Sequence, residues 1–317
     1  MNHANPNRTA ELARNVAVAL RFKQTQGKPE MPQVEKEVLA PNYDRVRGGN
    51  LHLANNARDQ GWPHPALYLR AALPDRVDVM EQVIADGDRV GLLFRVTGTH
   101  TGNFFGIPPT GRRIDVYEVA LLRIVNGQMV EGWYMMDEAE LLRQLGAKLP
   151  LRPDGKLIAP PFPQTDDAAT FFKKLEDQPV LTALDRNKRI AARTRLSTQA
   201  KEGMAVGHKN LRYGFEHTRG YSKVHGHGEL NLNAAFAERF YGLDVLLAEG
   251  NQVWMRFNVN GIHNGPFCGI VPTGARMGVN AVAMVNFDDE GTITSSWTFA
   301  DELGVLLQLG RPNLLLE

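Results

Sequence analysis

The sequence predicts an α+β protein built from two tandem copies of one domain. Two observations support this: a long motif occurs twice, and each copy runs from an opening helix through four β segments to a short closing helix. The chain has 317 residues, about twice a common domain length, so two hydrophobic cores fit. We expect a first domain over residues 8–147, a proline-rich linker over 148–170 and a second domain over 171–317.

The repeated motif is a glycine-rich loop. Residues 98–111 read GTHTGNFFGIPPTG and residues 261–274 read GIHNGPFCGIVPTG, so nine of fourteen positions are identical at an offset of 163 residues. The same offset pairs His64 with His227 and Arg76 with Arg239. A second block, WYMMDEAELLRQLG from Trp133, matches WTFADELGVLLQLG from Trp297. A period this long indicates a duplicated domain and not a solenoid.

The order of elements within each copy follows from turn signals and hydrophobic periodicity. Opening helices are expected over about 9–26 and 184–202, each followed by a stretch that is helical or looped. The DGD sequence at 86–88 and the NG pair at 126–127 are hairpin signals. Helices followed by an antiparallel meander predict helices covering one face of a curved sheet. Strands of the first copy are expected over 75–85, 89–101, 112–125 and 128–136.

Composition narrows the classes of partner. Lys and Arg total 36 against 35 for Asp and Glu, and 43% of residues are hydrophobic, which is typical of a globular protein with no nucleic-acid or membrane partner. The single cysteine, Cys268, excludes an internal disulfide. The N-terminal sequence lacks a signal-peptide pattern, and no stretch is long and apolar enough to span a membrane. We therefore expect a soluble, cytoplasmic protein.

Two aspartates are candidate acid–base groups. Alternation along the last strand of each copy places Asp137 on the face of Trp133, and Asp301 on the face of Trp297. A carboxylate among aromatic walls is poorly solvated, which raises its pKa toward useful values. The alternative is structural, because each aspartate immediately precedes a helix. Asp137 is followed three residues later by Glu140, the signature of a capping box, whereas Asp301 lacks that glutamate.

Four histidines are candidates to orient or polarise a substrate oxygen. His100 and His263 end apolar strand faces, and the alternative is that each bonds the backbone of the loop that follows. His64 and His227 lie in loops, where simple surface exposure is the alternative. His225 and His227 form a His-x-His pair, but no third ligand completes it, so we expect no metal.

The repeated blocks resemble the SnoaL-like polyketide (ester) cyclase family, most closely in the first copy after Trp62. The resemblance implies the cone-shaped fold of nuclear transport factor two, a pocket between sheet and helices, and acid–base chemistry without cofactor or metal. It places the family's catalytic aspartate on Asp137 and, through the repeat, on Asp301. It places the motif histidine on His100 and His263. Founding members are single domains that oligomerise, so the fused copies suggest a built-in pseudodimer, and homo-oligomers of that pseudodimer are a further expectation.

The function expected from the resemblance is that of a lyase or isomerase. It would make or break a C–C bond next to a carbonyl or phenol of a small hydrophobic, aromatic or polyketide-like substrate. One alternative is a retro-aldol formaldehyde lyase or dehydratase acting on lignin-derived aromatics, and another is a non-catalytic small-ligand binding protein. The second copy has Asn280 and Ala281 in place of Tyr117 and Glu118, so the two pockets are not equivalent.

The predicted site comprises acid–base residues and aromatic walls, although tryptophans belong more often to a core than to a ligand platform. The predicted catalytic residues are Asp137, His100, Asp301, His263, His64 and His227, and the predicted substrate-binding residues are Trp62, Tyr68, Phe105, Tyr117, Trp133, Trp254, Phe267 and Trp297.

Overall fold

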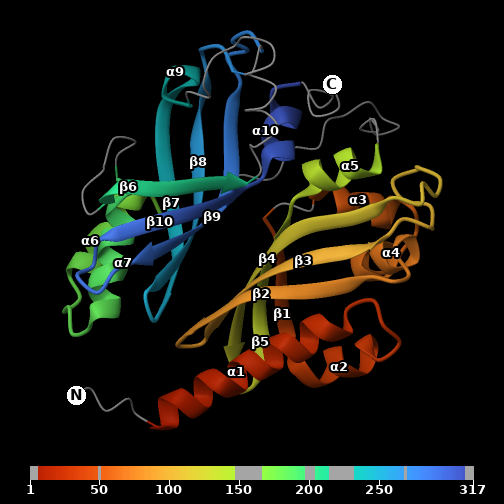
Figure 1. The fold of residues 1–317 in the computed structure, drawn as a ribbon, viewed down its shortest axis with the longest axis horizontal. Helices are drawn as coiled ribbons and strands as arrows, with labels where there is room; N and C mark the ends of the chain where they lie inside the picture. The colour runs from red at the N-terminus through yellow and green to blue at the C-terminus, as the bar shows by residue number, and fades with distance from the viewer. Residues whose placement is uncertain are drawn as a thin grey trace. The chain divides into compact units, whose positions relative to one another are not determined.

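The computed structural model describes residues 6–48, 51–146, 166–196, 204–213, 232–267 and 270–310. The chain divides into two compact units, Met1–Pro150 (unit 1) and Leu151–Glu317 (unit 2). Each unit has one curved sheet with helices packed on it, which is the α+β class that the repeat predicted (Figure 1).

Unit 1 has a five-stranded sheet in the order β1-β5-β4-β3-β2. Strands β2 to β5 form an antiparallel meander, and β1 pairs parallel with β5. Asn126 and Gly127, both with positive φ, form the β4–β5 turn that the NG pair predicted. The elements are α1 (Pro6–Thr25), α2 (Met31–Val38), β1 (Leu39–Arg47), α3 (Leu51–Asp59), α4 (Pro65–Ala72), β2 (Val77–Asp86), β3 (Arg89–Thr99), β4 (Arg113–Val125), β5 (Gln128–Met136) and α5 (Glu138–Leu145).

Unit 2 repeats this topology, with sheet order β6-β10-β9-β8-β7 and β6 parallel to β10. Its first helix begins inside the expected linker, because Asp167 caps α6 and the carbonyl of Asp166 accepts the Leu243 N–H. The elements are α6 (Ala168–Glu176), α7 (Ala183–Arg193), β6 (Met204–Tyr213), α9 (Leu232–Ala235), β7 (Phe236–Glu249), β8 (Gln252–His263), β9 (Arg276–Phe287), β10 (Ile293–Ala300) and α10 (Glu302–Gln308).

The edge strands β1 and β6 correct the sequence prediction, which expected four strands in each copy. Strand β1 contains Pro41 and Asn42, residues that disfavour strands, and its register with β5 shifts between Leu39 and Asp44. Proline is tolerated there because an edge strand leaves one row of N–H groups outside the ladder. Pairing with β5 is also distant in sequence, so no local pattern reveals it.

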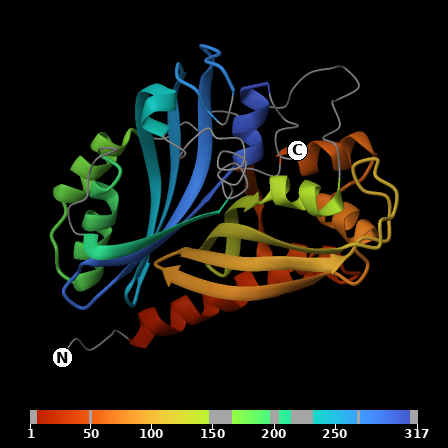
Figure 2. The ribbon, with the colours of Figure 1, turned by 45° about the horizontal axis from the view of Figure 1, so that its top comes forward.

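Helix α1 packs along the sheet of unit 1 (Figure 2). Its inward face buries Asn15, Ala19 and Phe22, spaced by three or four residues, and Lys23 lies on the same side, as does Gln26 just after the helix end. The neighbouring strand β3 is buried along nearly its whole length on both faces. Within the described residues, no helix has both the length and the apolar character needed to cross a membrane.

Candidate functional site

A cavity in unit 1 lies between the sheet and helices α1 and α4. Phe22, Leu69 and Met136 are among the apolar residues of its wall, and charged groups share that wall with them. The full lining is Phe22, Lys23, Gln26, Arg45, Leu53, His64, Pro65, Ala66, Leu69, Arg76, Glu118, Tyr134 and Met136. The mixture of apolar walls with a few converging polar groups is typical of a small-molecule site.

The cavity lies on one particular face of the sheet. Strand β5 contributes Tyr134 and Met136 to the lining, and these alternate with Trp133 and Met135. Trp133 therefore faces away from this cavity, although strand alternation had grouped it with the candidate acid Asp137. Both faces of β5 carry large buried side chains, so alternation found two apolar faces and could not decide which one the cavity uses.

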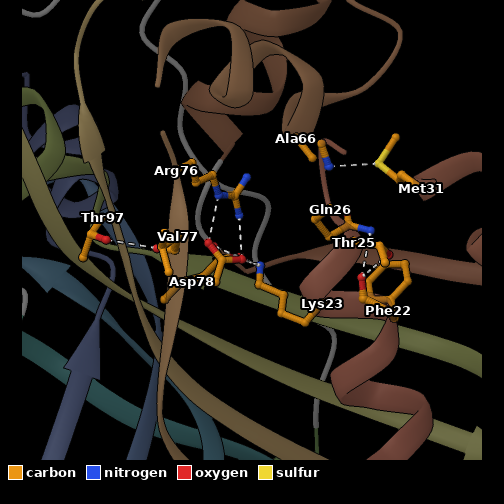
Figure 3. A network of polar contacts seen from close by, with 12 residues as sticks. Phe22, Lys23, Thr25, Gln26, Met31, Ala66, Arg76, Val77, Asp78 and Thr97 are labelled. Carbon is orange, nitrogen blue, oxygen red and sulfur yellow. Dashed lines mark hydrogen bonds and ion pairs between the residues drawn. The ribbon is translucent and has the colours of Figure 1, made fainter. Parts of the chain in front are cut away.

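Three charged side chains of the cavity wall, Lys23, Arg76 and Glu118, lie close to one another and to Asp78. Lys23 of α1 lies 3.4 Å from a Glu118 carboxylate oxygen on β4 and 3.7 Å from Asp78 on β2. Its ammonium group also lies 4.0 Å from the centre of the Phe94 ring. The Arg76 guanidinium donates to both Asp78 oxygens, from Nε at 2.8 Å and Nη2 at 2.9 Å (Figure 3). We call Lys23, Arg76, Asp78 and Glu118 the charge cluster.

The charge cluster is almost fully removed from water. The side chains of Arg76 and Glu118 are 3% and 5% exposed. Burial alone would raise the pKa of Asp78, but the Arg76 and Lys23 cations hold it below its usual range, so Asp78 stays ionised. The third guanidinium nitrogen of Arg76, Nη1, is buried and has no hydrogen-bond partner among the described residues.

Sequence reasoning did not select the charge cluster. One available signal was Glu118, a lone carboxylate within the apolar run VYEVALL, and another was Arg76, which the repeat retains as Arg239. Lys23 gave no clear signal, because a lysine in an amphipathic helix usually faces water. Burial of Lys23 depends on the docking of α1, which is a tertiary feature.

His64 is the predicted catalytic residue that does line the cavity. It caps α4, with its Nδ1 accepting the Ala66 N–H at 3.0 Å, and its Nε2 contacts the Arg45 guanidinium. Glu35 lies 3.7 Å from Arg45, so the histidine sits beside an ion pair. Its repeat partner His227 lies outside the described residues.

Asp137 and Asp301 both cap the closing helix of their unit. The Asp137 carboxylate accepts the Glu140 N–H and Asp301 accepts the Gly304 N–H, each at 2.9 Å. They differ in burial, since Asp137 is half-buried and Asp301 is 8% exposed. Burial raises the pKa of Asp301 to about 6, opposed by the Gly304 N–H. Neither aspartate lines the unit 1 cavity, and their catalytic role stays a prediction.

His100 and His263 hold the glycine-rich loop in the same way in both units. The ring Nδ1 of His100 accepts the Thr110 N–H at 3.3 Å, and that of His263 accepts the Thr273 N–H at 3.3 Å. Both rings are fully buried, which lowers their pKa, so each is a neutral histidine. These bonds favour the structural interpretation of both residues, and a role toward substrate stays a prediction.

Glycine is required in this loop for the same reason in each unit. A Cβ atom on Gly102 would lie 2.1 Å from the carbonyl oxygen of Ala71, and one on Gly265 would lie 2.0 Å from that of Ala234. The loop therefore passes directly over the end of a preceding helix. The most strongly repeated motif of the sequence is explained by loop geometry.

The predicted aromatic walls occupy three kinds of environment. Trp62, Tyr68 and Phe105 form one group: the first two rings are 5.8 Å apart, and the Tyr68 hydroxyl accepts the Phe105 N–H at 2.6 Å. Tyr117 is half-buried and lies beside Asp137: the backbone N–H of Asp137 donates to the backbone carbonyl of Tyr117. The others are Trp133, Trp254 and Phe267, which are buried, and the half-buried Trp297, which stacks on Phe299. Their substrate contacts stay a prediction.

Unit 2 has different groups at the positions of the charge cluster. Strand register places Tyr241 opposite Val259, as Asp78 lies opposite Val96. It also places Ala281 opposite Phe257, as Glu118 lies opposite Phe94. Unit 2 therefore has no carboxylate at the positions that match Asp78 and Glu118. Arg239, the counterpart of Arg76, bonds the Tyr241 hydroxyl at 2.8 Å, and Arg195 lies 4.4 Å from the Phe257 ring centre.

The sequence pattern of the SnoaL-like polyketide cyclase family matches residues 60–145 and again 199–309. This chain belongs to the SnoaL-like polyketide cyclase family. A curated relative, the aklanonic acid methyl ester cyclase DauD of Streptomyces sp. (strain C5), is 39% identical over 67 residues, which is 21% of this chain and 41% of that protein. The match thus spans about two fifths of the relative's length.

Solved structures of similar proteins cover about half of this SnoaL-like chain. A putative SnoaL-like polyketide cyclase from Jannaschia sp. CCS1 is 27% identical, with 47% of this chain and 99% of that one covered and a TM-score of 0.37. The putative polyketide cyclase IdmH from Streptomyces antibioticus is 24% identical over 42% of this chain and 99% of its own, with a TM-score of 0.36. The relatives described above are named as cyclases.

Proposed function

We propose that this protein catalyses an aldol-type reaction, making or breaking a C–C bond next to a carbonyl group of a small aromatic or polyketide-like ester. The terminal aspartates Asp137 and Asp301 are the proposed acid–base groups. The aromatic side chains predicted from the sequence are the proposed contacts for the apolar part of the substrate.

The observation that best supports this proposal is the state of Asp301. Its carboxyl group is buried at the end of the last strand, and its pKa of about 6 leaves it able both to accept and to release a proton near neutral pH. The backbone N–H of Gly304 donates to it at 2.9 Å. Ordinary surface aspartates, with a pKa near 4, are weaker bases.

The proposed chemistry is balanced in protons and electrons. The carboxylate removes a proton from the carbon next to a carbonyl, giving an enolate. The enolate carbon attacks a second carbonyl of the same molecule, one C–C bond forms, and the new alkoxide takes up a proton. Nothing is oxidised or reduced. The reverse sequence breaks the bond, so the direction depends on the substrate.

Two substitutions, Asp137→Asn and Asp301→Asn, test the proposal singly and together. Asparagine keeps a side-chain oxygen for the helix cap but cannot take up the proton. With aklanonic acid methyl ester as the first substrate tried, because DauD is named for it, loss of the essential base should lower kcat by about 10²- to 10⁴-fold. Asp177→Asn, at the exposed end of α6, is the control and should leave the rate unchanged.

Comparison of the single variants identifies the working unit. A large loss in only one of them assigns the reaction to that unit. If both single variants and the double variant turn over substrate at the unmodified rate, the acid–base assignment is wrong. Unchanged binding without turnover in any form of the protein supports the alternative of a non-catalytic ligand-binding protein.

A further inference from the structure

We propose that Arg76 of unit 1 is a binding residue for a carbonyl oxygen of the substrate, with Asp78 as its positioning residue. The proposal rests on the proposed function for the type of substrate, but its evidence is the cavity itself. The ligand class is an aryl ketone or ester whose carbonyl oxygen gains negative charge during the reaction.

Asp78 fixes the direction in which Arg76 can bind. Two of the three guanidinium nitrogens are held by the carboxylate, at 2.8 Å and 2.9 Å, so the planar group cannot rotate. The remaining nitrogen, Nη1, is the one with no hydrogen-bond partner among the described residues, and Arg76 lines the cavity. A buried charged donor left without an acceptor is costly, so this nitrogen marks a position where an acceptor is expected.

The charges around Arg76 favour a carbonyl oxygen over a fully charged anion. Lys23 and Arg76 are balanced by Asp78 and Glu118, and Arg45 has Glu35 nearby at 3.7 Å. A preformed carboxylate would add a charge with no matching cation. A carbonyl oxygen is neutral when it binds and becomes negative as an enolate forms, when a fixed guanidinium donor stabilises it most.

Apolar side chains complete the site. Phe22, Leu53 and Leu69 share the wall with Arg76, and they are the proposed contacts of an aromatic ring whose carbonyl reaches the guanidinium. In unit 2 Tyr241 stands at the position of Asp78, and the counterpart Arg239 donates to its hydroxyl at 2.8 Å. The carboxylate that holds two guanidinium nitrogens of Arg76 is therefore replaced by a tyrosine at the matching position of unit 2.

Acetophenone and ethylbenzene are suitable probes, since they have nearly the same shape and differ in the carbonyl oxygen. A hydrogen bond to a charged donor contributes about 1.5–3 kcal/mol, so the full-length protein should bind the ketone at least about tenfold more tightly. In nitrogen-labelled protein, acetophenone should shift the Arg76 guanidinium resonances, and ethylbenzene should not. This measurement uses the unmodified protein and does not depend on the folding of a variant.

Arg76→Lys keeps the positive charge but removes the planar guanidinium group with its several donors. It should reduce the preference for acetophenone over ethylbenzene to under about twofold. Arg239→Lys is the matched control in unit 2 and should leave the preference unchanged. Asp78→Asn should lower the ketone preference while ethylbenzene binding stays constant, a change that loss of stability alone does not produce.

Three outcomes would overturn the proposal. The ketone preference could survive Arg76→Lys, or it could disappear equally in Arg239→Lys. It could also be absent from the unmodified protein up to the solubility limit of the probes. None of these outcomes depends on turnover. Asp137→Asn can abolish catalysis while ketone binding persists, so failure of this proposal and failure of the proposed reaction are distinguishable.

Discussion

In unit 1 the cation on the opening helix, Lys23, lies over Phe94 and is close to Glu118 and Asp78. In unit 2 Arg195, which lies just after the end of α7, is placed over Phe257, and its ring contact on β7 is Tyr241. Strand order and the histidine-held loop are the same in both units.

Features present in both units are required by the fold, whereas features present in unit 1 alone are better explained by the unit 1 site. The glycine-rich loop and its histidine recur because the backbone path of that loop needs them in each unit. The two carboxylates of the charge cluster are absent at the matching positions of unit 2, although the sheet register around them is preserved. The fold does not require them, so a role in the unit 1 site accounts better for their presence.

The largest expected effect comes from breaking the buried ion pair of unit 1. Arg76→Ala leaves the Asp78 carboxylate buried without its main partner, which should lower the free energy of unfolding of unit 1 by about 3–5 kcal/mol. Arg239→Ala in unit 2 breaks the bond to a neutral hydroxyl, which contributes about 1 kcal/mol, so a smaller loss is expected there. Urea unfolding followed by tryptophan fluorescence measures both, and equal losses would remove the distinction between the units.

The next effect concerns the buried acid of unit 2. The pKa of Asp301 is about 6 in the folded chain against 3.8 for an ordinary aspartate, so the folded state binds the proton more tightly. Stability is therefore lost as pH rises from about 4 to about 6, by about 3 kcal/mol. Asp301→Asn should remove this loss and be more stable than the unmodified protein at pH 7.5.

Asp137→Asn is the matched change in unit 1. Asp137 makes the same cap but is only half-buried, so the same substitution should bring a smaller gain at pH 7.5. Thermal unfolding at pH 4 and pH 7.5 checks both variants. A gain for Asp137→Asn equal to that for Asp301→Asn would show that burial does not set the difference.

The loop contacts should respond equally in the two units. Thr110→Ala and Thr273→Ala each remove a hydroxyl that lies within 3.0 Å of the buried histidine. Each should lower the free energy of unfolding of its unit by about 1 kcal/mol. Denaturant titrations of the two variants should give matching shifts, and a large difference would mean that the loop is held differently in the two units.

The smallest effect is a gradual loss of stability in acid. The pKa values of His100 and His263 lie below 6.5 in the folded chain because both rings are buried. The unfolded chain therefore binds protons first as pH falls below about 6.5, and folding becomes weaker. The double variant His100→Gln with His263→Gln should show a shallower fall between pH 6.5 and pH 5 in a series of thermal melts.

The duplication, the hairpins and the strands of the meander could be predicted because they depend on local sequence. The NG pair at Asn126 and Gly127 has the backbone preference that the turn needs, and strand β5 has the predicted bounds Gln128–Met136. The helix cap at Asp137 follows from adjacent residues in the same way. Edge strands β1 and β6 were missed because they pair with strands far away in sequence.

The sequence by itself determined that two copies of one α+β domain would form, and that a histidine and glycines would shape the same loop in each. Only the tertiary structure decided which face of the sheet holds the unit 1 cavity, because both faces carry apolar side chains. It also decided that Lys23, Arg76, Asp78 and Glu118 meet there. Their contacts depend on how α1 docks against β2 and β4, and no local preference encodes that arrangement.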